Sequence, residues 1–328
     1  MPKSKILVFG ATGFIGRNIA TSFAENDDFD VHAVYNNRPR FEDERITWHQ
    51  CNLTKPASVK TLVSTLQPKK IIQAAAATSG IMDIASNPAI HVTDNAVMNS
   101  YIFRIAAETG VEQVVFFSCT IMYQSSLVPI KEFDFDANLK LESKYFGAAH
   151  TKLYLEKLCE FYASISNTKF TVIRHSNIYG PFDKYDLEKS HFLGATVSKV
   201  MTANREIIVW GEGLEKRDLL YVGDLVDMVF SALMQQSDMF QIYNCGLGIG
   251  YSVAAITEMI LRTSGKQLAI RYDASKPSVN FSLVLDCTRA EKQLGWTPQT
   301  TLEEGLVKTL SWWKENIDPE TLILRQHA

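Results

Sequence analysis

The strongest indication of the fold lies near the start of the chain, in the stretch Ile6-Leu7-Val8-Phe9-Gly10-Ala11-Thr12-Gly13-Phe14-Ile15-Gly16. Its first four residues are all apolar, which is typical of a strand buried on both faces. Three glycines follow at intervals of three residues, and residues 17–25 are expected to form a helix. Gly10 permits a tight turn, Gly13 lets a phosphate approach the backbone, and Gly16 lets the helix pack closely on the strand.

The start of that helix is suited to a pyrophosphate because its N–H groups are free and it has a partial positive charge. Glycines at this spacing are a weak signal alone, but a strand before them and a helix after them are what a dinucleotide-binding turn requires. We therefore predict a dinucleotide site; the alternative is an ordinary glycine-rich turn. The predicted contacts in this stretch are Gly10, Thr12, Gly13, Phe14, Ile15 and Gly16.

The composition is that of a globular protein, with 328 residues, 46% of them hydrophobic and 21% charged. A net charge of −3 gives no basic surface for nucleic acid. The five cysteines are scattered without a CxxC pair, so we expect neither a metal site nor a disulfide framework. No apolar run approaches the roughly 20 residues of a membrane span. The first residues lead directly into the strand without room for a signal peptide, so we expect the cytoplasm and no membrane partner.

Strand and helix patterns alternate along the first half of the chain. This alternation predicts an α/β fold with a Rossmann-type, doubly wound parallel sheet, and ligands beyond the carboxyl ends of its strands. Beyond the first strand and helix, the expected strands are 31–35, 46–51, 70–76, 114–118 and 170–175, and the expected helices are 57–66, 95–109 and 147–165.

The pattern changes after Gly180-Pro181. We predict a dinucleotide-binding domain over 1–180 and a smaller substrate-binding lobe over 181–328 that is interleaved with it. The expected helices of this second half are 191–202, 222–234, 252–263 and 302–315, and its expected short strands are 207–210, 241–245 and 268–272.

Further motifs follow the glycines in order, and together they resemble the extended short-chain dehydrogenase/reductase superfamily of nucleotide-sugar epimerases, dehydratases and reductases. The resemblance covers nearly the whole chain. Segments 179–184, 189–191 and 209–213 are similar to the GDP-L-fucose synthase group within it. The motifs are Asn52-Leu53, the alanine run 74–77, Asn95, Arg174, Asn177-Ile178-Tyr179-Gly180-Pro181, Arg217-Asp218, Val222, Asp224, Asn244, Gly246 and Leu294-Gly295-Trp296-Thr297-Pro298.

The resemblance implies an NAD(P) cofactor, a nucleoside-diphosphate sugar as substrate, and a homodimer formed through helices 95–109 and 147–165. It implies further cofactor contacts at Asn52, Leu53, Ala75 and Asn95.

The end of the second strand indicates which dinucleotide binds. An acidic residue there would bind the ribose hydroxyls of NAD, whereas a basic residue accommodates the 2′-phosphate of NADP. Residues 34–40 contain no carboxylate, and Arg38 is placed to pair with a phosphate. We predict NADP, with NAD possible; the alternative is that Arg38 is a solvated loop residue.

The catalytic helix departs from the superfamily's pattern. The resemblance implies a Tyr acid/base four residues before a Lys that holds the nicotinamide ribose, because positions i and i+4 share a helix face. Lys152 matches the Lys, but position 148 is alanine, which cannot move a proton. Tyr145 shares the face of Lys152, although roughly 10 Å along the helix axis, and His150 has an imidazole that can move a proton but points elsewhere. We favour Tyr145 as the replacement.

The strand before this helix should supply a hydroxyl or thiol. Cys119 falls at the expected position, Thr120 follows it and is the better donor, and Ser118 is a third candidate. The alternative for Cys119 is a buried small apolar residue. The resemblance also implies that His191 is an acid in an epimerisation step; the alternative is a structural histidine.

The predicted substrate contacts follow from the resemblance. Asn177 matches a residue that contacts the sugar or diphosphate, and Arg217 matches an arginine that clamps the diphosphate with its planar fork. Trp210 offers a flat face for a base or ribose, with core packing as the alternative. Lys184 is a further candidate for the phosphate or sugar.

These expectations favour an NADP(H)-dependent enzyme that reduces or epimerises a 4-keto nucleotide sugar such as a GDP-sugar. One alternative is a dehydratase or epimerase with a non-standard acid/base. The other is a catalytically impaired protein that senses the dinucleotide or regulates a partner. A pure cofactor sensor would not need Arg217, Trp210 and Asn177.

Overall fold

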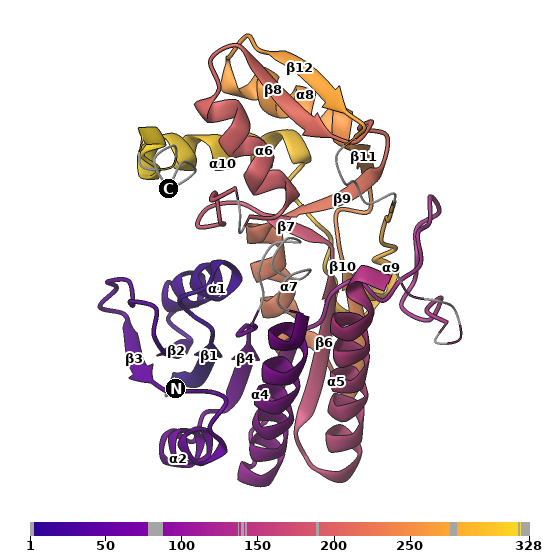
Figure 1. The fold of residues 1–328 in the computed structure, drawn as a ribbon. Helices are drawn as coiled ribbons and strands as arrows, with labels where there is room; N and C mark the ends of the chain where they lie inside the picture. The colour runs from indigo at the N-terminus through magenta and orange to yellow at the C-terminus, as the bar shows by residue number, and fades with distance from the viewer. Residues whose placement is uncertain are drawn as a thin grey trace.

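A parallel sheet of seven strands forms the centre of the computed structural model, which describes residues 3–77, 88–136, 138, 141, 143–187, 190–275, 281–320 and 322 (Figure 1). The strand order is β10-β6-β5-β4-β1-β2-β3, and every neighbouring pair is parallel. This confirms the predicted Rossmann-type sheet. Its strands are β1 (Ser4–Phe9), β2 (Phe29–Tyr35), β3 (Ile46–Gln50), β4 (Lys70–Gln73), β5 (Gln113–Phe117), β6 (Lys169–His175) and β10 (Phe240–Cys245).

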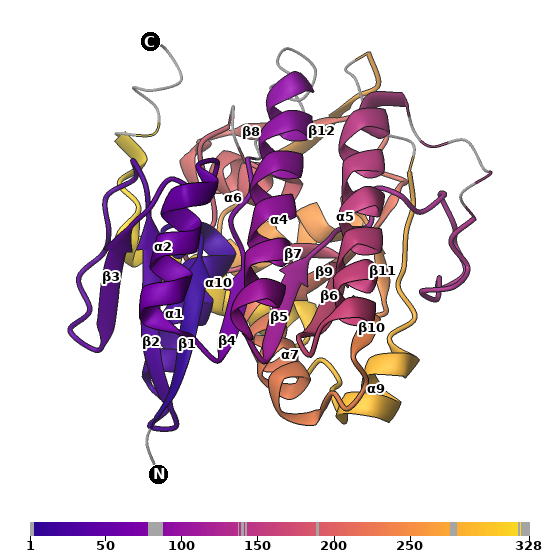
Figure 2. The same cartoon turned by 90° about the horizontal axis from the view of Figure 1, so that it is seen from below.

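Helices cover both faces of the sheet, as a parallel sheet requires. The side chains of β5 alternate between the faces: Val115 and Phe117 face α1 (Phe14–Ala24) and α7 (Val222–Gln235). Val114 and Phe116 of the same strand face the opposite layer of helices. That layer comprises α2 (Pro56–Leu66), α4 (Pro88–Thr109) and α5 (Phe146–Ile165), which lie side by side in Figure 2.

A smaller lobe lies beyond one end of the large sheet (Figure 1). It has its own apolar core, in which Tyr179, Leu193, Leu219 and Trp313 are buried. Its elements are a three-stranded sheet of β7 (Asn177–Tyr179), β9 (Lys216–Tyr221) and β11 (Gly250–Ser252), a pair of β8 (Glu206–Trp210) and β12 (Ala269–Asp273), and helices α6 (Phe192–Thr202), α8 (Val253–Ser264) and α10 (Leu302–Asn316).

The structure differs from the sequence-based expectations in several elements. Strand β10 pairs with β6 in the large sheet, so the chain returns to that sheet after residue 180. Strand β4 ends at Gln73 rather than Ala76, and the chain then passes close to Gly10 at Ala74 and Ala75. The short elements β7, β9, β11, α9 (Thr288–Leu294) and the 3-10 helix η1 (Ser143–Tyr145) were not expected.

Among the described helices, none has both the length and the apolar character needed to cross a membrane.

Candidate active site

The glycine turn after β1 leaves no room for side chains. Gly10 has a φ of +74°, and a Cβ there would lie 2.5 Å from Ala75 N. A Cβ on Gly16 would lie 2.2 Å from Gly10 O, which explains the close packing of α1 on β1. Gly13 is the N-cap of α1 and makes no side-chain cap, so the first N–H groups of the helix remain available for a ligand. This arrangement fits a dinucleotide pyrophosphate.

A cavity of about 970 Å³ extends from this turn along the carboxyl ends of the large sheet into the smaller lobe. Two predicted cofactor residues do not line it. Gly16 packs against Gly10, and Asn52 accepts hydrogen bonds from Thr54 N–H at 3.0 Å and Thr54 Oγ1 at 2.8 Å. The predicted cofactor residues that line the cavity are Gly10, Thr12, Gly13, Phe14, Ile15, Arg38, Leu53, Ala75, Asn95 and Lys152.

Asn95 shapes the wall of the cavity through its side-chain amide. Its Oδ1 accepts from Ala77 N–H at 3.0 Å, and its Nδ2 donates to Ala77 O at 2.9 Å and to His91 O at 2.8 Å. The amide therefore fixes the alanine segment that follows β4.

Lys152 projects from α5 to the carboxyl end of β5. Its Nζ donates to Phe117 O at 2.7 Å and lies 4.7 Å from the centre of the Phe116 ring. Desolvation lowers the pKa of Lys152 below its ordinary value. Ala148, one helical turn earlier, is not among the residues that line the cavity.

The side chains that follow β5 differ in whether they can bind a ligand. Ser118 Oγ donates to Glu156 Oε1 at 2.5 Å, so this hydroxyl is already engaged. Cys119 and Thr120 also line the cavity. Desolvation raises the pKa of the Cys119 thiol, which therefore stays protonated at neutral pH. Thr120 is thus the hydroxyl at this point best placed to meet a ligand.

The two sequence-based candidates for the missing acid/base lie apart. Tyr145 ends η1, just before α5, and lines the cavity. Its phenol acts electrostatically on the Arg217 guanidinium, so it lies toward the substrate side of the site. His150 is exposed and packs on the Phe146 ring with 4.5 Å between ring centres; it does not line the cavity.

Three predicted substrate residues converge on the smaller lobe's part of the cavity. Arg217 donates from Nη1 to Phe281 O at 2.6 Å, and burial lowers the pKa of its guanidinium. Asn177 donates from Nδ2 to Asp218 O at 3.2 Å. Trp210 is 42% exposed, with Lys199 Nζ 5.4 Å from its ring, so core packing is not its role.

Lys184 and His191 line the same cavity. His191 is the N-cap of α6, and desolvation followed by the charge of Lys184 lowers the pKa of its imidazole. Lys189, part of the motif that contains His191, lies outside the described residues.

Sequence reasoning gave no role to several titratable residues of the cavity, among them His175, Asp183 and Lys199. Burial raises the pKa of Asp183 to about 7 and lowers the pKa of His175 to about 4. The available signal for His175 was its place at the carboxyl end of an expected strand, where ligands bind in such sheets.

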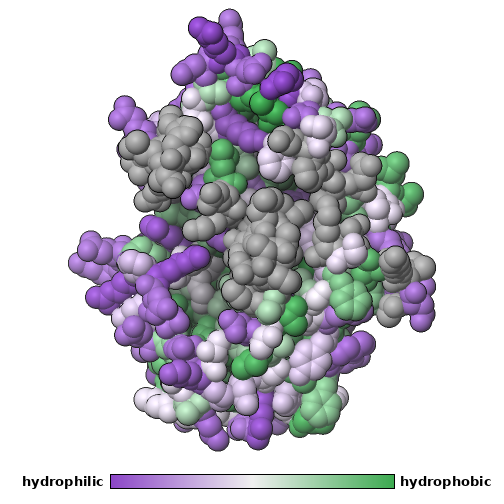
Figure 3. Space-filling view, in the orientation of Figure 1, coloured by the Kyte–Doolittle hydropathy of each residue, from purple (hydrophilic) through white to green (hydrophobic). Residues whose placement is uncertain are grey.

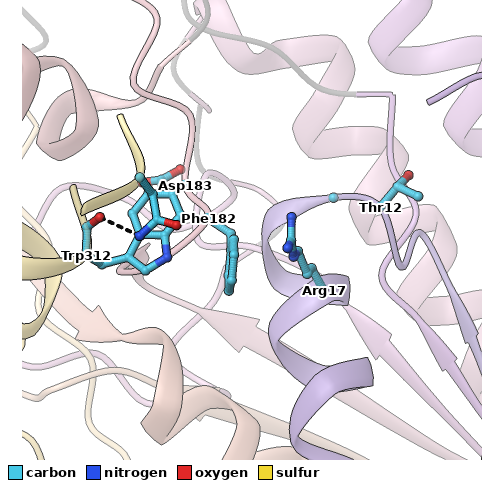
Figure 4. Close-up of a pocket in the computed structure, with 7 residues that line it drawn as sticks. Thr12, Arg17, Phe182, Asp183 and Trp312 are labelled. Carbon is cyan, nitrogen blue, oxygen red and sulfur yellow. Dashed lines mark hydrogen bonds between the residues drawn. The ribbon is translucent and has the colours of Figure 1, made fainter. Parts of the chain in front are cut away.

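A second cavity, of about 350 Å³, adjoins the glycine turn and shares Thr12, Gly13 and Asp183 with the larger one (Figure 4). The Arg17 guanidinium is held between Phe41 and Phe182, 4.4 Å and 3.8 Å from their ring centres. Asn18 Nδ2 donates to Pro181 O at 3.0 Å. These contacts join α1 to the segment that leads to Asp183, so the glycine turn and the wall of the larger cavity are held together.

A model of the NAD dependent epimerase/dehydratase family matches residues 6–246. The chain belongs to this family. The GDP-L-colitose synthase of Yersinia pseudotuberculosis is 27% identical over 94% of this chain and 97% of its own length. The GDP-L-fucose synthase of Sinorhizobium fredii is 28% identical over 95% of this chain and 96% of its own.

Solved structures with the same fold are found as well. A UDP-glucose 4-epimerase of Thermotoga maritima, solved with UDP-glucose, aligns with a TM-score of 0.85 at 23% identity, covering 96% of this chain and all of that one. A UDP-glucose 4-epimerase of Thermus thermophilus in complex with NAD aligns with a TM-score of 0.82 at 19% identity, covering 95% of this chain and all of that one. At these identities the likeness establishes the fold.

Proposed function

We propose that this protein is an NADP(H)-dependent enzyme that reduces a 4-keto nucleoside-diphosphate sugar, with or without epimerisation. The observation that supports this most strongly is the continuity of one cavity from the glycine turn to Arg217 and Trp210. A dinucleotide and a second nucleotide can therefore meet end to end beside Lys152. The GDP-L-colitose and GDP-L-fucose synthases among its relatives support a GDP-sugar.

In this proposal the N-terminus of α1 binds the pyrophosphate of the cofactor. Arg38, exposed at the rim of the cavity, pairs with the 2′-phosphate of NADP. The cavity-lining residues 34–38 include no acidic side chain that would repel this phosphate. Lys152 holds the nicotinamide ribose. The bound nicotinamide supplies or accepts a hydride.

Arg217 and Lys184 bind the diphosphate of the substrate, and the planar fork of Arg217 can contact two phosphate oxygens at once. Trp210 stacks on the base or its ribose, and Asn177 contacts the sugar or diphosphate. Thr120 and the Cys119 thiol donate hydrogen bonds to a substrate oxygen, which draws electron density from the sugar carbon. His191 contacts the substrate from the start of α6.

Ala148 favours two other candidate functions, because a methyl group cannot move a proton. One is a dehydratase or epimerase that uses another acid/base. The other is a non-catalytic protein that responds to the dinucleotide.

The test is to mix the purified protein with NADPH and a panel of 4-keto nucleotide sugars and to follow nicotinamide absorbance. We expect oxidation of NADPH with at least one GDP-sugar. Firm NADPH binding by fluorescence with no turnover of any 4-keto sugar would contradict the proposal and favour the sensor. Ala148→Tyr should raise turnover, whereas Ala148→Phe, which has the same ring without the hydroxyl, should not.

A further inference from the structure

His175 is the last residue of β6, and it lines the large cavity on the side of the sheet's carboxyl ends. Its ring meets the Phe117 ring edge to face, with 6.2 Å between ring centres. Phe117 O is also the acceptor of the Lys152 Nζ–H bond, so one residue of β5 touches both side chains. Lys152 and His191 line the same cavity as His175, and their charges act on its imidazole.

The hydrogen bond of the imidazole fixes its tautomer. His175 Nδ1 lies 2.8 Å from Ser176 O, and a carbonyl oxygen can only accept, so Nδ1 holds the hydrogen. The other ring nitrogen, Nε2, is therefore left with a lone pair in the neutral ring. A histidine oriented in this way through one nitrogen is a suitable base at the other.

The surroundings of His175 keep it neutral. Burial is the main cause that lowers the pKa of His175 to about 4, and the charges of Lys152 and His191 add to it, while the bond to Ser176 opposes them. Two of the nearby titratable groups differ from His175, because the Cys119 thiol is held protonated and the Lys152 ammonium donates to Phe117 O. At neutral pH, His175 Nε2 can therefore take a proton without first losing one.

We propose that His175 is the group that exchanges a proton with the substrate oxygen in this site, in place of the hydroxyl that Ala148 cannot provide. This inference rests on the proposed function. In the oxidising direction, Nε2 takes the proton of the sugar hydroxyl, the C–O bond becomes C=O, and the hydride leaves the same carbon for the oxidised nicotinamide. In the reducing direction, the carbonyl carbon gains the hydride and its oxygen takes the proton from Nε2–H; the imidazole then recovers a proton from solvent.

A pH signature follows from the low basicity of His175. The reducing direction needs the imidazolium, which becomes tenfold scarcer with each pH unit above its pKa, so reduction should slow by about tenfold per unit between pH 6 and 8. The oxidising direction needs the neutral ring, so its rate should not change over the same pH range. The groups facing His175 from the elements around it are Lys152, His191 and, after β5, Cys119.

The first experiment does not need turnover. In ¹⁵N-histidine-labelled wild-type protein, NMR should detect one imidazole with hydrogen at Nδ1 and a bare Nε2, and this signal should be missing from His175→Gln. Titration with NADPH should move the Nε2 resonance, because a nicotinamide ribose held by Lys152, as the proposed function requires, would bring the nicotinamide into the cavity that His175 lines. The exposed His150, which does not line the cavity, is the internal control. An Nε2 resonance that NADPH leaves in place would overturn the inference, whatever the substrate.

The second experiment measures single-turnover oxidation of bound NADPH by the 4-keto sugar. His175→Gln should reduce the rate by about 10²–10⁴-fold and leave the NADPH Kd within about twofold. His150→Gln should change neither. In an Ala148→Tyr background the same His175→Gln change should reduce the rate far less, because the phenol can move the proton. A rate for His175→Gln within tenfold of wild type overturns the inference, whereas absence of turnover in wild type contradicts the proposed function itself.

Discussion

Arg38 is the residue on which the proposed preference for NADP rests. Its exposed guanidinium stands at the rim of the cavity beside Asn36 and Asn37. We expect Arg38→Glu to weaken NADPH binding at least tenfold and to leave NADH binding unchanged or improved, because a carboxylate repels the 2′-phosphate and can accept from ribose hydroxyls. Arg40→Glu, an equal change of charge at an exposed residue that does not line the cavity, is the control. Equal NADPH affinity in the two variants would contradict this role for Arg38.

Asp183 makes stability depend on pH. Burial raises the pKa of its carboxyl to about 7, although Lys184 N–H donates to it at 2.7 Å. In the unfolded chain the pKa is about 3.9, so folding takes up a proton between about pH 4 and 7, and stability falls as pH rises through this window. Asp183→Asn can still accept from Lys184 N–H and should be more stable than wild type at pH 8 by roughly 2–4 kcal/mol.

Urea unfolding of the Asp183→Asn variant at pH 8 and pH 5 tests this prediction. The difference from wild type should shrink at the lower pH, because the wild-type carboxyl is then largely neutral. Glu212→Gln removes a charge at an exposed residue and should change stability little at either pH. A constant difference between the Asp183 variant and wild type at both pH values would refute the prediction.

Glu156 and Arg174 form a buried ion pair beneath the cavity, with 2.6 Å between Oε2 and Nη2. Glu156→Gln leaves the Arg174 charge without its carboxylate and should destabilise the protein by about 3–5 kcal/mol in urea unfolding. The exposed pair of Lys157 and Glu160, at 2.7 Å, is the control. Glu160→Gln should cost less than about 1 kcal/mol. Similar losses in both variants would show that burial of the pair has little effect.

At the scale of elements, the sequence predicts the large sheet well because its strands have strong local signals. The strand Gln113–Phe117 is buried along its whole length, so its apolar run is visible in the sequence. The strands Asn177–Tyr179 and Gly250–Ser252 have three residues each, too few for a periodic pattern, and both were missed. The place of β10 beside β6 depends on tertiary packing, which no local signal reports.

The same distinction between local signals and tertiary packing explains which parts of the site could be predicted from the sequence. The glycine turn is predictable because the close contact of Gly16 with Gly10 lies within one short segment of the chain, so the spacing of the glycines reports it. The contact of Gly10 with Ala75 is tertiary and has no such local signal. The proximity of His175 to Lys152 and His191 depends on β6, α5 and the start of α6 coming together, so nothing near His175 in the sequence indicates it. Tyr145 likewise acts on Arg217, which is 72 residues away in the chain (217 minus 145).

Helix α1 provides a test at the scale of an element. Gly16 lies inside the helix, where alanine would ordinarily favour helix formation by about 1 kcal/mol. A Cβ there would nevertheless lie 2.2 Å from the Gly10 carbonyl oxygen, so Gly16→Ala must push α1 away from β1. We expect a lower melting temperature and at least a tenfold weaker affinity for NADPH by fluorescence titration.

Gly265→Ala is the matched control for Gly16→Ala. Gly265 has a φ of +75°, and among the described residues no other side chain or distant backbone atom lies within 4 Å of the position that a Cβ would take. Alanine there therefore costs about 1–2 kcal/mol of backbone strain without a clash. This control should lower the melting temperature and leave NADPH affinity unchanged. If Gly16→Ala behaves in the same way, the close packing of α1 on β1 is not required for the dinucleotide site.

At the scale of the whole molecule, the outer layer of α4 and α5 has a surface suited to a second copy of the chain. Val97 and Tyr101 of α4, and Tyr154, Phe161 and Ile165 of α5, are each more than a third exposed. Hydrophobic and near-neutral side chains gather over this lower part of the molecule in Figure 3. Large exposed apolar patches on such faces are typical of protein interfaces.

We therefore expect a homodimer, with twice the chain mass of 36.9 kDa in light scattering after size exclusion. Phe161→Glu and Ile165→Glu each place a charge in the apolar contact and should shift the mass to that of the monomer, because an unpaired charge is costly to bury. Leu214→Glu alters a residue that is 71% exposed in the smaller lobe and should leave the dimer intact. A wild-type mass of one chain at tens of micromolar, or a dimer unaffected by both α5 variants, would show that this face does not join two copies.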